Sequence, residues 1–162
     1  MASNFEHSVS YPFSVAELWA LLSDEQYWRA LLHATNAEHG VLESFSRDGD
    51  VVTVVTKQGI AAENLPKAVT AVRPGDLEIP RTCVFTKSDG TVTGRMDASV
   101  SGAPAKISGD IAITGEPAVA RYAGSVDVSI PFVGGKIERA VIEQVVMLLD
   151  AERDATLDFQ DR

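Results

Sequence analysis

The chain has 162 residues, of which 45% are hydrophobic and 23% charged, a composition typical of a single globular domain spanning residues 1–162. Its formal net charge of −9 argues against nucleic-acid binding and against docking on anionic lipid, because both need clustered lysine and arginine. Cys83 is the single cysteine, which excludes an intramolecular disulfide and a cysteine-rich zinc site.

The N-terminal segment predicts a strand rather than a targeting signal. Residues 1–10 lack the basic start and apolar core of a signal peptide, and no apolar run in the chain approaches the ~18 residues of a membrane span. We therefore expect a cytoplasmic protein without stable membrane insertion. Residues 4–10 alternate apolar and polar side chains, with Phe5, His7 and Val9 on one face of the predicted strand.

Two short helices are predicted next, each opened by a capping box. Ser14 with Glu17 has the spacing that lets a hydroxyl accept from a backbone amide while the carboxylate reaches back. Ser23 with Gln26 repeats this spacing. We therefore expect one helix to begin after Ser14 and a second to begin after Ser23.

The rest of the chain up to residue 130 alternates with a period of two and predicts an antiparallel meander. A hairpin is expected at Asp48-Gly49, a pair typical of tight turns between strands. Residues 64–72 predict a short helix, with Asn64 as its cap and Pro66 in its first turn. Further strands are expected at residues 77–87, 91–100, 105–114 and 118–130.

The alternation within these strands predicts a sheet with one solvated and one covered face. Three glycines, Gly94, Gly109 and Gly124, fall on the covered face. Glycine there is typical of tight curvature or close backbone approach. The missing side chains could equally leave volume for a ligand, and both interpretations stay open at the level of sequence.

A helix of about 25 residues is predicted to cover the sheet. Gly134-Gly135 is interpreted as the flexible turn that precedes it, because the residues around Lys136 do not match a phosphate-binding loop. Glu152 is unusual because it lies in the middle of the apolar stripe, where a buried carboxylate without a partner would have a raised pKa. The stripe itself comprises Ile137, Val141, Val145, Leu148, Ala155 and Phe159, widened by Ile142 and Leu149.

The order of strand, two helices, six strands and long helix resembles the helix-grip fold of the START-like (SRPBCC) superfamily. The segments "HSVSYPFSVAELWALLSDEQYW" and "VSIPFVGGKIERAVIEQ" resemble one bacterial branch of it, catalogued as a domain of unknown function. The resemblance implies an α+β fold in which a curved seven-stranded antiparallel sheet grips the C-terminal helix. It also implies the strand order first, seventh, sixth, fifth, fourth, third, second. A cavity for lipids, sterols, polyketides or other apolar molecules would lie between sheet and helix.

Three functions follow as hypotheses. The first is non-catalytic binding, carrying or sensing of a small hydrophobic molecule, with no metal and no cofactor. The second is a cyclase- or hydratase-like enzyme that uses His7, Tyr122 or Glu152 as acid–base groups. The third is a ligand-free module with a filled core that binds a protein partner. The candidate cavity residues are His7, Val92, Gly94, Met96, Ile111, Tyr122, Val141, Gln144, Leu148 and Glu152.

Overall fold

The computed structural model describes residues 2–37, 39–65, 67–72 and 74–160. In chain order the elements are β1 (Ala2–Ser10), α1 (Val15–Leu22), α2 (Glu25–Asn36), β2 (Val41–Asp48), β3 (Val51–Ile60), the 3-10 turn η1 (Ala62–Asn64), α3 (Lys67–Val72), β4 (Leu77–Ser88), β5 (Thr91–Ser99), β6 (Ala105–Thr114), β7 (Val119–Val128) and α4 (Gly134–Gln160).

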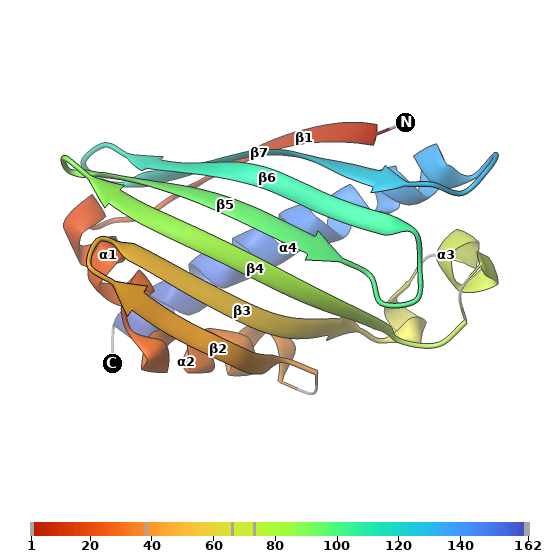
Figure 1. Cartoon of the computed structure of the whole chain (residues 1–162), viewed down its shortest axis with the longest axis horizontal. Helices are drawn as coiled ribbons and strands as arrows, with labels where there is room; N and C mark the ends of the chain where they lie inside the picture. The colour runs from red at the N-terminus through yellow and green to blue at the C-terminus, as the bar shows by residue number, and fades with distance from the viewer. Residues whose placement is uncertain (1, 38, 66, 73, 161–162) are drawn as a thin grey trace.

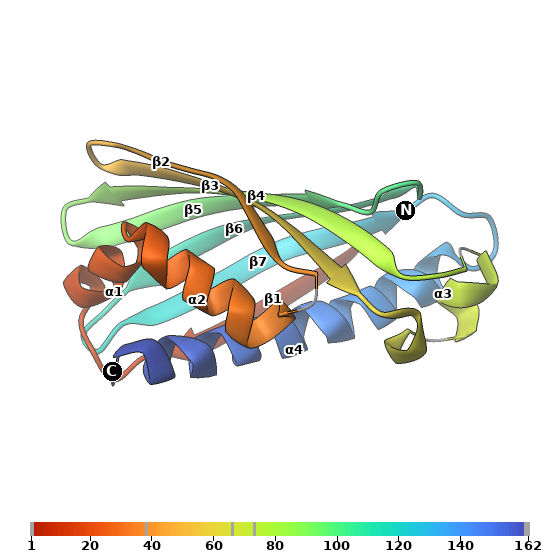
Figure 2. The ribbon, with the colours of Figure 1, turned by 90° about the horizontal axis from the view of Figure 1, so that it is seen from below.

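The seven strands form one antiparallel sheet in the order β1-β7-β6-β5-β4-β3-β2 (Figure 1). Each of the strands β2 to β6 pairs with the next strand along the chain. β1 pairs with β7, so that α1 and α2 cross from one edge of the sheet to the other. Figure 2 shows α1, α2 and α4 on the same side of the sheet, with α4 running along it. The predicted fold class and strand order are confirmed.

The side chains on the two sheet faces differ as the alternation predicts. Toward the helices, β3 presents Val52 and Val54 and β7 presents Val126, all fully buried. Toward solvent, Arg95 and Asp97 of β5 are exposed. One face is therefore the core of the molecule and the other is its surface.

The inward glycines mark close backbone approach. Gly109 of β6 lies directly opposite Gly124 of β7. A Cβ on Gly124 would collide with the carbonyl oxygen of Ser108, and a Cβ on Gly94 would lie 2.9 Å from the ring of Phe85. The interpretation of close approach is confirmed. At Gly94 and Gly124, neighbouring atoms occupy the space that a Cβ would need.

The two N-terminal helices begin in different ways. Ser14 caps α1 as predicted, since its hydroxyl accepts from the amide of Glu17 at 3.1 Å. The prediction for α2 is wrong by one residue, because Asp24 caps this helix and accepts from the amide of Gln26 at 2.9 Å. The hydroxyl of Ser23 instead donates to the carbonyl of Trp19, at the C-terminal end of α1.

The segment between β3 and β4 holds two short pieces of helix in place of the single one predicted over residues 64–72. Asn64 is the last residue of η1, and α3 spans Lys67–Val72. The predicted first-turn residue Pro66 lies outside the described residues.

The start of α4 differs from the prediction as well. The glycine pair forms the first turn of the helix. The chain reverses two residues before it, where Phe132 adopts a left-handed conformation with φ of 71°. Gly134 is required by packing, since a Cβ there would lie 2.5 Å from the carbonyl oxygen of Val128. Buried Glu138 accepts from the amide of Val128 at 2.9 Å and so holds the helix against β7.

Candidate ligand-binding site

A cleft of about 720 Å³ opens beside the middle of α4. Its other walls are the C-terminal end of α2 and the segment that runs from the end of β3 through η1 to α3. The volume lies within the range of small-molecule sites. The larger aliphatic side chains of its lining are those of Ile60, Leu65, Val69, Leu77, Val141, Val145 and Leu148.

The cleft exists because α4 is buried at its two ends and only partly covered between them. Near the N-terminal end, Ile137 and Glu138 are buried beside β7. Toward the C-terminal end, Leu149 and Thr156 are almost completely buried. The intervening turns, which include Val141, remain half-buried, so their apolar stripe faces the cleft instead of packed side chains.

Some of the polar side chains around the cleft are occupied by the protein itself. The carboxamide of Asn36 bonds both backbone groups of Gly59, at 2.9 and 2.8 Å, which joins α2 to β3. Thr35 donates to the carbonyl oxygen of Leu31. Gln144 on α4 and Gln58 on β3 also line the cleft.

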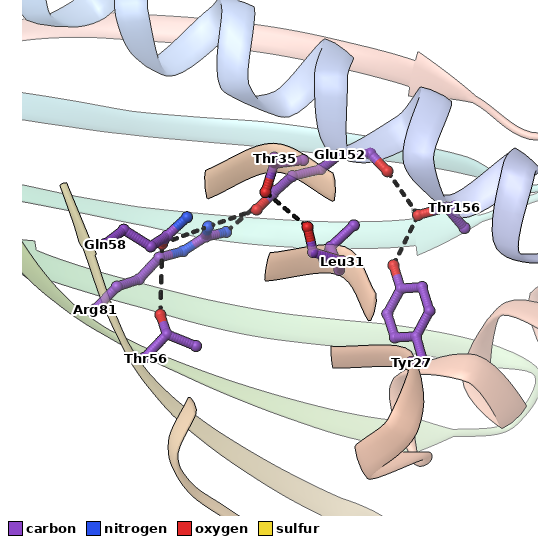
Figure 3. A network of polar contacts seen from close by, with 8 residues as sticks. All are labelled: Tyr27, Leu31, Thr35, Thr56, Gln58, Arg81, Glu152 and Thr156. Carbon is purple, nitrogen blue, oxygen red and sulfur yellow. Dashed lines mark hydrogen bonds and ion pairs between the residues drawn. The ribbon is translucent and has the colours of Figure 1, made fainter. Parts of the chain in front are cut away.

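A buried polar network joins β3, β4 and α4 (Figure 3) and adjoins the cleft at Gln58. The guanidinium of Arg81 on β4 pairs with both carboxylate oxygens of Glu152 on α4, at 2.8 and 3.4 Å. The same guanidinium donates to the Gln58 carboxamide oxygen at 3.4 Å, and the hydroxyl of Thr56 donates to that oxygen at 3.4 Å. Gln58 therefore connects the ion pair with the cleft.

The network encloses a small recess of about 10 Å³, roughly the size of one water molecule. Its polar lining comes from Thr56, Gln58, Arg81 and Glu152. The Nε atom of Arg81 is buried and has no hydrogen-bond partner among the residues that the structure describes. Gln58 lines both the recess and the cleft, so the two spaces adjoin at this side chain.

A second set of contacts fixes the C-terminal half of α4. The hydroxyl of Thr156 donates to the carbonyl oxygen of Glu152 at 2.7 Å, and the hydroxyl of Tyr27 lies 2.7 Å from Thr156 (Figure 3). Burial raises the pKa of Tyr27 well above its ordinary value. Tyr27 is thus neutral at physiological pH, and its hydroxyl can donate to Thr156.

The charge states around the ion pair follow from its surroundings. Burial alone lowers the pKa of Arg81, but the surrounding acidic groups, with the carboxylate of Glu152 in direct contact, outweigh it and raise the pKa above the ordinary value. Burial raises the pKa of the Cys83 thiol, although Arg81 opposes the effect. Arg81 is therefore charged, and Cys83 is a protonated thiol of low reactivity.

Four of the predicted cavity residues lie at the cleft or the recess. Val141, Gln144 and Leu148 line the cleft, and Glu152 lines the recess. The remaining six lie elsewhere in the fold. Four of these, Val92, Gly94, Met96 and Ile111, belong to the inward face of the central strands.

The two other acid–base candidates are not at the cleft. His7 lies at the sheet edge, where its Nε2 is 2.7 Å from a carboxylate oxygen of Asp150 on the exposed side of α4. Tyr122 of β7 lies on the covered face of the sheet, opposite Ile111 of β6. Burial is the main cause of its raised pKa. His7, Tyr122 and Glu152 therefore do not share one cavity that a substrate can enter.

Sequence reasoning missed Arg81, Gln58 and Thr56. Each occupies an inward position of its strand: Thr56 and Arg81 lie two residues from buried Val54 and Cys83, and Gln58 lies two residues after Thr56. The sequence pattern that could have identified Arg81 is a charged side chain between Ile79 and Cys83 on the covered face of the strand. It would have predicted the buried partner of Glu152.

Within residues 2–37, 39–65, 67–72 and 74–160, no group of three or more histidine, cysteine, aspartate or glutamate residues could hold a metal ion. In the same part of the chain, no helix is long and apolar enough to cross a membrane.

The sequence matches the model of a family described as "Protein of unknown function (DUF2505)" over residues 6–159. Relatives in Mycobacterium tuberculosis and Mycobacterium bovis, named as uncharacterized proteins, are 31% identical to it. Each alignment covers 96% of this chain and 95% of the relative.

Similar solved structures share the START-like fold. An aromatase/cyclase, Zhui of Streptomyces sp. R1128, aligns with a TM-score of 0.62 and 10% identity over 100% of this chain and 95% of that one. A START superfamily protein of Mycobacterium smegmatis gives 0.56 and 12%, over 96% and 98%. Norcoclaurine synthase of Thalictrum flavum gives 0.54 and 16%, over 97% and 87%. At these identities the likeness concerns the fold.

Proposed function

The chain belongs to the family described as "Protein of unknown function (DUF2505)", and we propose that it binds a small apolar molecule in the cleft beside α4 without transforming it. The observation that carries this proposal is the half-buried apolar stripe at the centre of α4. Val141, Val145 and Leu148 face a space of about 720 Å³. Covering apolar surface contributes about 25 cal/mol per Å², so an apolar occupant gains affinity from these side chains.

An enzyme of the cyclase or hydratase kind is the weaker alternative. It is suggested by solved neighbours named as an aromatase/cyclase and a norcoclaurine synthase. Acid–base catalysis needs groups within hydrogen-bond reach of one substrate. Here His7 is engaged by Asp150 at the sheet edge, and Glu152 is engaged by Arg81 behind the cleft wall. Binding is therefore the function that the geometry favours.

A ligand-free interaction module is the third alternative. Phe132 in the turn before α4 is fully exposed and Met147 on α4 is largely exposed, so each offers an apolar surface to a protein partner. That hypothesis requires a filled interior, whereas the cleft lies against the centre of α4. The cleft is the reason for ranking ligand binding above protein binding.

Native mass spectrometry of gently purified protein, followed by solvent extraction, tests the proposal directly. We expect a bound apolar compound that is released on denaturation. A displacement assay with the neutral dye Nile red adds a test by mutation. Ala140 lines the cleft, so Ala140→Trp fills part of it and should weaken dye binding about tenfold or more.

The matched control is Ala123→Trp, because Ala123 is exposed on the outer face of β7. It introduces the same side chain away from the cleft and should leave dye affinity unchanged. Equal loss of dye binding in both variants, or protein that is always empty and binds no dye, would contradict the proposal.

A further inference from the structure

The carboxamide of Gln58 is held in one orientation by its neighbours. Its oxygen accepts from the guanidinium of Arg81 and from the hydroxyl of Thr56, and a guanidinium can only donate. The oxygen must therefore point toward Arg81, and the amide nitrogen must point away. No hydrogen bond joins this nitrogen to any residue that the structure describes.

Gln58 presents this nitrogen where a ligand can reach it. The side chain is buried, with 5% of the residue exposed, yet it lines the cleft as well as the recess. The recess behind it has room for about one oxygen atom and is lined by Arg81, whose Nε is an unused donor. The inner end of the cleft thus brings the free amide nitrogen of Gln58 next to a recess that Arg81 lines and that has space for one acceptor atom.

The ion pair decides what charge that acceptor can carry. Arg81 is neutralised by Glu152, with the two side chains only 9% and 12% exposed. A ligand carboxylate at this point would be a buried anion without a counter-ion, close to the carboxylate of Glu152, which is energetically costly. A neutral oxygen meets the donors without that cost.

We propose that the ligand is an apolar molecule with a neutral hydrogen-bond acceptor, a carbonyl or hydroxyl oxygen, which Gln58 and Arg81 bind at the inner end of the cleft. This inference rests on the proposed function, because it specifies the chemistry of a molecule bound in the same cleft. The Arg81–Glu152 pair orients Gln58 and prevents the site from accepting an acid. The aliphatic walls contact the remainder of the molecule.

Displacement of Nile red by four compounds of equal chain length tests the inference: 2-nonanone, 2-nonanol, nonane and nonanoate at pH 7.5. The informative variant is Gln58→Met, which preserves side-chain length and removes the amide. We expect it to weaken binding of the ketone and the alcohol about two- to tenfold, as the loss of one hydrogen bond implies. Nonane should bind within about twofold of its wild-type affinity, since it makes no such bond.

Gln26→Met is the matched control, because it makes the same change at an exposed position in the first turn of α2, outside the lining of the cleft and of the recess. It should leave the affinities of all four compounds within about twofold. Thermal unfolding of both variants verifies that they are folded. The wild-type protein alone provides a further test. 2-Nonanone should displace Nile red from it at a lower concentration than nonanoate does.

The inference is overturned if Gln58→Met weakens the ketone and nonane equally, or if nonanoate binds wild-type protein better than the ketone. Either result leaves the proposed binding of apolar molecules in place. If the wild-type protein binds neither the dye nor any of the four compounds, the proposed function itself fails.

Discussion

Arg81 of β4 and Glu152 of α4 form a buried ion pair that joins the centre of the sheet to the C-terminal helix, with Nη1 and Oε2 2.8 Å apart. Glu152 lies in the middle of the apolar stripe of α4, and Arg81 lies on the covered face of the sheet. Removing one partner leaves the other charged and buried. Removing both leaves an apolar interior that can repack.

We therefore predict that Arg81→Met and Glu152→Leu each lower the free energy of unfolding by about 3–5 kcal/mol. The double variant should lose less than the sum of the two, because neither charge remains unpaired. Urea denaturation of the four proteins measures the coupling. Additive losses would show that the two side chains do not interact across the interface.

The start of α2 gives a second prediction. Asp24→Ala removes the carboxylate that accepts from the Gln26 amide, and should lower the free energy of unfolding by about 1 kcal/mol. Ser23→Ala is the control, since Ser23 bonds the carbonyl of Trp19 at the end of α1 instead of capping α2. The larger loss should be that of Asp24→Ala in chemical denaturation. A larger loss for Ser23→Ala would reinstate the capping box that the sequence predicts.

Local pattern was enough to predict most of the fold. Alternation located the strands because a half-buried sheet needs a period of two, and the 3.6-residue period located α4. The capping error has a local cause: Ser23-Asp24 places two possible caps side by side, and the motif does not show which of them α2 uses. The strand order rested on resemblance to a known fold, since period alone does not determine which strands are neighbours.

The candidate site was only half predictable. Helix periodicity located Val141, Gln144 and Leu148 on the side of α4 that faces the cleft. The opposite wall depends on how α2 and the segment after β3 dock, and no local pattern encodes that arrangement. Arg81 and Gln58 were predictable in principle from their inward positions, but only once the alternation of their own strands was followed residue by residue.

The glycine pair at the start of α4 gives a third prediction. A Cβ on Gly134 would meet the carbonyl oxygen of Val128 at 2.5 Å, while a Cβ on Gly135 would find only the flexible Arg139 side chain, at 3.8 Å. Gly134→Ala should therefore cost about 1–3 kcal/mol of unfolding free energy. Gly135→Ala should be neutral or stabilise by up to about 1 kcal/mol, because alanine loses less backbone entropy in a helix.

Thermal or urea unfolding of these two alanine variants distinguishes packing from a general need for flexibility before the helix. If both substitutions destabilised equally, the pair would act as a flexible turn, as the sequence first suggested. A loss confined to Gly134→Ala would identify the contact with β7 as the reason for glycine at that position.

Glu138 makes stability depend on pH in the acid range. The hydroxyl of Ser3 and the amide of Val128 donate to its carboxylate at 2.6 and 2.9 Å, and these bonds lower the pKa of Glu138 below its ordinary value. The unfolded chain then binds the proton more readily than the folded protein. Glu138 thus stabilises the fold above the ordinary glutamate pKa of about 4.3, and this contribution disappears as pH falls through the lower folded value.

Glu138→Gln should accordingly lower the urea midpoint at pH 7, because the neutral amide is a weaker acceptor for the Val128 amide than a carboxylate. The gap between variant and wild type should narrow as pH falls below about 4, where the wild-type carboxyl group takes up its proton. Glu143→Gln on the exposed side of the same helix is the control and should follow the wild-type curve. A gap of constant size from pH 7 to pH 3 would mean that the carboxylate charge of Glu138 does not hold α4 to β7.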